Sequence, residues 1–202
     1  MSYEIIILWS WAVLMFVWVV GSFGVKRDIR SGSVSSKVLA YRYLFLQVIG
    51  IVLVVFTLWH VVTGRDDSTK AVAAIFSNGT FTPPLALNWI AAILVVLGIL
   101  FAIWARINLG RNWSSTPSIK ENHKLVTSGP YRFVRHPIYT GILLAAFGTA
   151  LTGTSFGIIL FLIALIIFSL RIPKEEKIML ELFPNEYPSY QRRTKRLIPF
   201  VW

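Results

Sequence analysis

Long uncharged stretches alternate with short basic ones along most of the chain. Ile5 to Gly24, Tyr43 to Thr63 and Leu85 to Ala105 contain no Asp, Glu, Lys or Arg. Each is about 20 residues long, enough for a helix to cross roughly 30 Å of hydrocarbon. The pattern predicts three membrane-spanning helices here.

A fourth uncharged stretch is too long for one crossing. Pro137 to Leu170 has 34 residues without a charged side chain, and Thr152-Gly153-Thr154 near its middle is typical of a turn. We expect a tight helical hairpin, which brings the number of transmembrane helices to five. The predicted fold class is an all-α integral membrane protein.

The polar tail carries a weaker helical pattern. Lys174 to Phe183 places its apolar residues on one helical face, and a basic and aromatic stretch follows Pro184. This predicts C-terminal cytoplasmic interfacial helices. We divide the chain into N-terminal transmembrane helices 1–3, residues 1–108, and a C-terminal half, residues 109–202, that contains the candidate chemistry described below.

Composition supports a membrane protein. Of the 202 residues 55% are hydrophobic and 14% charged, more apolar surface than one small soluble core could bury. The net charge of +11 is dispersed over loops, which favours orientation in the lipid bilayer over a nucleic-acid partner. The absence of cysteine excludes disulfides and thiolate sites.

Loop charges predict the orientation. The loop after the first stretch has five basic residues against one acidic, Arg106 to His136 has six against one, and the tail from Arg171 has seven against four. The loop between the second and third stretches is balanced. Because basic loops stay inside, we expect a multi-pass protein with the N-terminus outside and the C-terminus cytoplasmic. The first stretch lacks a basic leader, so we expect a retained helix and not a cleaved signal peptide.

Candidate chemistry begins at His136-Pro137. Proline suits the first helical position and disfavours helical geometry before it, so a helix should begin here with His136 at its cap. Its free N–H groups, with Arg132 and Arg135 nearby, suit an anion, and Tyr131 and Tyr139 could place aromatic faces against a cation. The alternative is that these residues anchor a helix end at headgroup level.

A second constellation follows the last apolar residue. Arg171 and Glu175 are four residues apart, the spacing of a helical ion pair, and a hairpin returns them to the membrane face that holds His136. The alternative is a solvated ion pair that ends a helix. His123 and His136 have no carboxylate at a ligand's spacing, so we predict no metal site.

Taken together, these residues resemble a known family. The stretches His123 to Tyr131 and Arg135 to Gly141, then Arg171 with Glu175-Glu176, and finally Phe183, Glu186-Tyr187 and Tyr190 are similar in order and spacing to the isoprenylcysteine carboxyl methyltransferase and phospholipid methyltransferase superfamily.

This resemblance implies an integral membrane methyltransferase that uses S-adenosyl-L-methionine in a cytoplasm-facing site. It implies that Arg171 binds the substrate's acceptor group, that Arg171 and Glu175 form the catalytic pair, and that the tyrosines flank the sulfonium. The implied cofactor-binding residues are His123, Lys124, Leu125, Val126, Tyr131, His136, Pro137, Ile138, Tyr139 and Glu175.

The acceptor is less defined. The resemblance and the short chain favour a small lipophilic or lipid-linked acceptor and a bacterial or archaeal inner membrane, and the oligomeric state is not predicted. Two other functions stay open: a membrane NADPH-dependent enzyme like the sterol reductases, and a non-catalytic membrane scaffold. Cofactor binding separates all three, because a scaffold should bind neither cofactor.

Overall fold

The computed structural model describes residues 3–22, 81–110 and 125–199. Within them lie α1 (Tyr3–Ser22), α4 (Leu85–Leu109), the short 3-10 helix η2 (Gly129–Arg132), α5 (Pro137–Leu151), α6 (Ser155–Leu182) and α7 (Tyr187–Arg193). An isolated parallel bridge joins Val134 to Lys195, and turns and irregular segments connect the helices. The predicted helical class is confirmed.

Three of the described helices are long and apolar enough to cross a membrane: Tyr3–Gly21, Leu85–Leu109 and Ser155–Leu182. α5 has 15 residues and is therefore about 22 Å long, shorter than the hydrocarbon core. The second predicted span, Tyr43 to Thr63, lies outside the described residues. The total of five stays a prediction.

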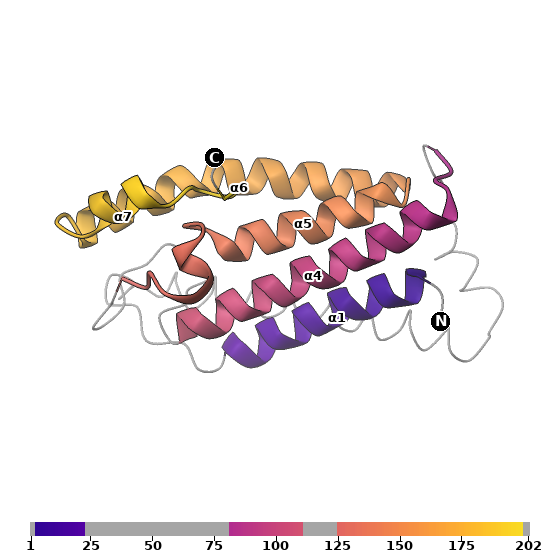
Figure 1. The fold of residues 1–202 in the computed structure, drawn as a ribbon, viewed down its shortest axis with the longest axis horizontal. Coiled ribbons are helices and arrows are strands. Elements are labelled where there is room, and N and C mark those ends of the chain that lie inside the picture. Colours follow the sequence, from indigo (N-terminus) through magenta and orange to yellow (C-terminus); the bar gives the residue numbers. More distant parts are fainter. Residues whose placement is uncertain (1–2, 23–80, 111–124, 200–202) are drawn as a thin grey trace, which may run out of the picture.

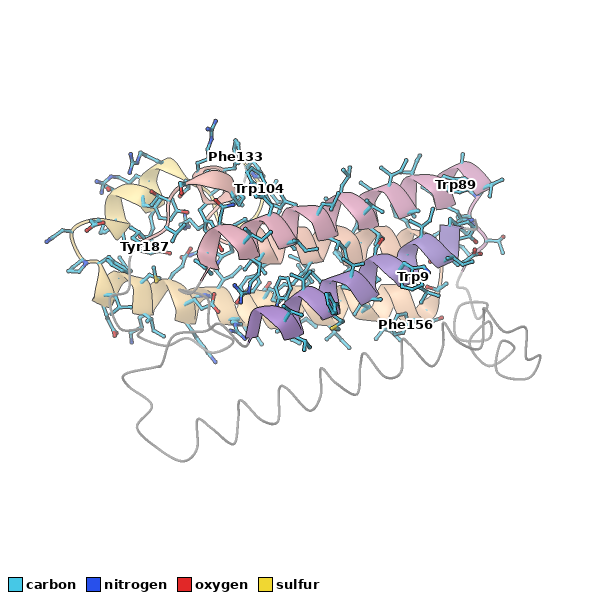
Figure 2. All side chains as sticks on the ribbon, turned by 90° about the horizontal axis from the view of Figure 1, so that it is seen from below. Trp9, Trp89, Trp104, Phe133, Phe156 and Tyr187 are labelled. Carbon is cyan, nitrogen blue, oxygen red and sulfur yellow. The ribbon has the colours of Figure 1, made fainter. Side chains whose placement is uncertain are left out.

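The helices pack in the order α1, α4, α5, α6, each against the next (Figure 1). Many large apolar side chains are exposed on their outer sides, among them Phe16, Ile93, Leu100 and Ile166. Figure 2 shows Trp9, Trp89 and Phe156 towards one end of the helices and Trp104 and Phe133 towards the other. An apolar surface with aromatic side chains at both ends suits a bilayer and its two interfaces.

Small residues let α4 and α5 approach closely. A Cβ on Gly98 would lie 2.5 Å from the carbonyl oxygen of Gly141, and a Cβ on Gly148 would lie 2.8 Å from that of Ala91. Lipid is as apolar as these side chains, so close backbone contact is what holds such helices together. This seam fixes α5, which carries the candidate site at its first turn.

The connection between α5 and α6 lies where the turn chemistry predicts it. Gly153 has a φ of 75°, which favours glycine, and the Thr154 hydroxyl accepts a hydrogen bond from the Gly157 N–H at 3.1 Å. α6 then runs in one piece through Pro173 to Leu182. The helix predicted over Lys174 to Phe183 is therefore the end of α6 and not a separate element.

Proline is tolerated inside α6 at a modest cost. Pro173 has no N–H to donate to the Ser169 carbonyl, but both residues are exposed at the end of the apolar stretch. The continuity of the helix keeps Arg171 and Glu175 on one face.

The seam between α4 and α5 gives a direct test. We expect Gly98→Val to force the two backbones apart and to lower the free energy of unfolding by about 1–3 kcal/mol. Leu97→Val on the same helix introduces the same side chain at an exposed position and should change it much less. Thermal unfolding in detergent compares the two variants, and equal melting temperatures would contradict the close packing.

Candidate functional site

The first turn of α5 meets the last third of α6 through one carboxylate. The Tyr139 hydroxyl donates to Glu175 Oε1 at 2.6 Å, and Arg171 Nε donates to the same oxygen at 2.7 Å. The Glu175 side chain is 21% exposed and that of Arg171 29%. We call these three residues the site cluster. It is polar, nearly neutral in charge and accessible from outside.

Stacked rings hold Tyr139 in place. Its ring is nearly parallel to that of His136, with centroids 5.6 Å apart, and to that of Phe168, at 4.3 Å. Because ring contacts engage the face of Tyr139, its hydroxyl is the group it presents to Glu175. The sequence suggested that the aromatic face of Tyr139 could contact a cation, but the rings of His136 and Phe168 already stack on Tyr139.

His136 caps α5 as its sequence predicts. Its carbonyl accepts the Thr140 N–H at 3.0 Å, while Pro137 and Ile138 are buried in the first helical turn. The imidazole Nδ1 lies 3.7 Å from Glu175 Oε2. The cap therefore borders the site cluster.

The segment before α5 makes a tight corner. Gly129 has a φ of 59°, and a Cβ there would collide with the side chain of Asn108. The corner buries Tyr131 in a small cluster with Ala105 and Ile138. The Gly-Pro-Tyr segment thus packs the entry to α5 against the end of α4.

Tyr190 of α7 secures that corner. Its hydroxyl donates to the Tyr131 carbonyl at 2.6 Å. Burial raises the pKa of both phenols, that of Tyr190 to about 12 despite the opposing effect of Arg135. Both tyrosines are therefore neutral hydrogen-bond donors at physiological pH.

Arg106 has a role that its sequence does not reveal. It is buried in α4 and donates to the Gly21 carbonyl of α1 at 2.6 Å and to the Gly110 carbonyl at 3.0 Å. It thereby ties the end of α1 to the end of α4, directly below Tyr131's cluster. Its position immediately after an uncharged stretch is the only signal that singles it out.

Glu176 is the second residue that sequence reasoning missed. It is buried and bonded to Arg135 at 2.8 Å and to Arg196 at 3.1 Å. Arg135 is thus engaged by protein groups, although its sequence suggested an anion ligand. The adjacent acidic pair Glu175-Glu176 was visible in the sequence, but the different partners of the two side chains were not.

The sequence-predicted residues divide into three groups. The structure brings His136, Tyr139, Arg171 and Glu175 together. Leu125 and Val126 lead into η2, where Val126 packs on the cluster of Tyr131 and Ile138. The third group, His123 and Lys124, lies outside the described residues.

Comparison with known proteins finds similarity to one family over part of the chain. Residues 90–181 match the isoprenylcysteine carboxyl methyltransferase (ICMT) family. A probable protein-S-isoprenylcysteine O-methyltransferase of Oryza sativa subsp. indica is 31% identical over 122 residues, which cover 56% of this chain and 62% of the relative. Protein-S-isoprenylcysteine O-methyltransferase B of Arabidopsis thaliana is 33% identical over 133 residues, covering 60% and 66%.

The chain thus covers less than two thirds of the length of these two relatives. A solved structure of the eukaryotic intramembrane Ras methyltransferase ICMT is similar in fold, with a TM-score of 0.54 at 24% identity over 78% of this chain and 67% of that one. With three helices long enough to span, the chain is an integral membrane protein. Residues 90–181, which contain all three residues of the site cluster, are the part of the chain that matches the isoprenylcysteine carboxyl methyltransferase family.

Proposed function

We propose that this chain is an integral membrane methyltransferase that uses S-adenosyl-L-methionine and acts on a small lipophilic or lipid-linked acceptor. The observation that carries the proposal is the site cluster, in which Glu175 joins Tyr139 of α5 to Arg171 of α6. It lies within the residues that match the family, and the relatives are named as methyltransferases.

The residues of the site fit this cofactor chemically. S-adenosyl-L-methionine carries a sulfonium, an ammonium and ribose hydroxyls, which all favour a carboxylate such as Glu175. Glu175 is partly exposed, and its second oxygen, Oε2, lies 3.7 Å from Nδ1 of the His136 imidazole. In a partly dry site a carboxylate binds a cation more strongly than it does in water.

The chemistry asks the protein for alignment more than for acid–base catalysis. When the donor is bound it supplies a methyl group on a positively charged sulfur, and the charge disappears as the acceptor attacks. Holding both reactants in line in a water-poor site supplies most of the rate gain. Arg171 would hold an acceptor carboxylate or phosphate through its planar array of N–H donors.

We also propose a five-helix topology with the N-terminus outside and the site at the cytoplasmic face. The basic loops support this orientation, and α6 returns to the end where α5 begins. An apolar substrate already dissolved in the bilayer can then reach Arg171 sideways. The location that we propose is a bacterial or archaeal inner membrane.

Calorimetry in detergent with S-adenosylhomocysteine tests the proposal. The purified wild-type protein should bind this product analogue and should not bind NADPH. Binding of NADPH alone would favour the reductase alternative, and a folded protein that binds neither compound would favour the scaffold.

Glu175→Gln removes the carboxylate charge at nearly constant size. A hydrogen bond to a charged group contributes about 1.5–3 kcal/mol, so we expect S-adenosylhomocysteine to bind at least tenfold more weakly. Tyr139→Phe, which deletes the 2.6 Å hydrogen bond to Glu175, should have a smaller effect in the same direction. The matched control is Glu181→Gln on the exposed side of α6. Unchanged affinity for S-adenosylhomocysteine in Glu175→Gln would show that the charge of Glu175 does not contribute to cofactor binding.

Arg171→Ala should impair use of the acceptor much more than binding of the cofactor. We expect the affinity for S-adenosylhomocysteine to change by less than about threefold, while methylation falls by about a hundredfold, the loss of one charged bidentate contact. Transfer of a labelled methyl group to a lipid extract measures the second quantity, with Lys174→Ala as the exposed control. Full methylation by Arg171→Ala would exclude the acceptor role.

A further inference from the structure

Glu176 is a buried carboxylate whose two partners come from separate segments of the chain. One segment precedes α5, the other follows α7, and the two lie against each other here. Its side chain is 6% exposed, and an ion this deep is stable only when paired and hydrogen-bonded. Arg135, before α5, donates to Oε1 at 2.8 Å. Arg196, after α7, approaches Oε2 with Nε at 3.2 Å and with Nη2 at 3.1 Å.

Backbone hydrogen bonds also join these two segments. The Arg135 N–H donates to the Lys195 carbonyl at 2.8 Å, and the His136 N–H donates to the Arg196 carbonyl at 3.1 Å. The Thr140 hydroxyl donates to the Leu197 carbonyl at 2.7 Å. Residues 187–197, which we call the C-terminal segment, are thereby laid along the entry to α5.

Arg135 extends this attachment to α7. Its Nη1 donates to the carbonyls of Gln191 and Thr194, the last turn and the C-cap of the helix. Since Glu176 holds the Arg135 guanidinium through Nε, the carboxylate sets where these two bonds can form. Loss of the Glu176 charge would loosen Arg135 and Arg196 together.

Glu176 also borders the imidazole of the site. His136 Nε2 is buried and lies 3.5 Å from Glu176 Oε1, while Nδ1 lies 3.7 Å from Glu175 Oε2. The imidazole thus lies between the carboxylate of the site cluster and the carboxylate that holds the C-terminal segment. Its ring also stacks on Tyr139, which bonds to Glu175.

We propose that Glu176 is a positioning residue that fastens the C-terminal segment to the entry of α5 and orients His136 beside Glu175, so that cofactor binding and docking of the segment are coupled. The coupling rests on the proposed function. Because such coupling is reciprocal, bound cofactor must stabilise the docked segment by the same factor by which docking strengthens binding.

Hydrogen exchange measured by mass spectrometry on the full-length protein in detergent tests the attachment. In Glu176→Gln, amides of residues 187–197 should exchange at least tenfold faster than in wild type, while α4 and α5 exchange at the wild-type rate. Glu181→Gln, the exposed control, should match wild type throughout. Unchanged exchange in 187–197, or an equal acceleration in α4, would overturn the attachment.

Binding of S-adenosylhomocysteine tests the coupling in the same samples. Glu176→Gln should bind about tenfold more weakly, and saturating S-adenosylhomocysteine should slow exchange of 187–197 in wild type. If wild type binds and Glu176→Gln binds equally well, the coupling is overturned while the proposed function stands. If wild type does not bind, the proposed function falls and the coupling with it, and the exchange data still decide the attachment.

A second pair of variants guards against misfolding of Glu176→Gln. Arg196→Gln removes only the partner from the C-terminal segment and leaves the Arg135–Glu176 bond intact. It should accelerate exchange in 187–197 and weaken binding, whereas Arg196→Lys, which keeps the cation, should restore most of both. Equal behaviour of the glutamine and lysine variants would show that the charge at position 196 does not matter and would overturn the proposal.

Discussion

Two neighbouring carboxylates at the end of α6 have to be neutralised, and much of the surrounding structure serves that requirement. Glu175 and Glu176 are successive residues on one helix, so their side chains point in different directions. Glu175 pairs with Arg171 one turn earlier and accepts a hydrogen bond from the hydroxyl of Tyr139. Glu176 requires partners from more distant parts of the chain, Arg135 and Arg196.

These two requirements assemble the polar end of the protein. A buried carboxylate without a partner is strongly destabilising. Glu176 can therefore be buried only when the segment before α5 and the segment after α7 have both folded against it. The hydrogen bond from Tyr139 to Glu175 aligns the first turn of α5 with α6 at the same end of the protein. The helix packing deeper in the molecule would not by itself determine where the loops and the short α7 lie.

The apolar part of the protein works by a different principle. In lipid, burial of apolar side chains gives no advantage over exposure to acyl chains, so the glycine and alanine contacts between α4 and α5 provide the close packing. That seam fixes the position of Pro137 and of the first turn of α5. Precise placement of Tyr139 against Glu175 therefore depends on the backbone contacts that Gly141 and Gly148 of the same helix make with α4.

The sequence by itself determined the helical class, the turn at Thr152 to Thr154 and the start of α5 at Pro137, because these follow from local periodicity and from the backbone restrictions of proline and glycine. It also placed Arg171 and Glu175 on one helix face, since that spacing is local. Only the tertiary structure decided that α6 continues through Pro173, that Arg106 joins α4 to α1, and that Glu176 unites Arg135 with Arg196. These contacts link residues up to 85 positions apart, and the choice of partner for a buried charge depends on which groups the folded chain brings near it, which no local pattern records.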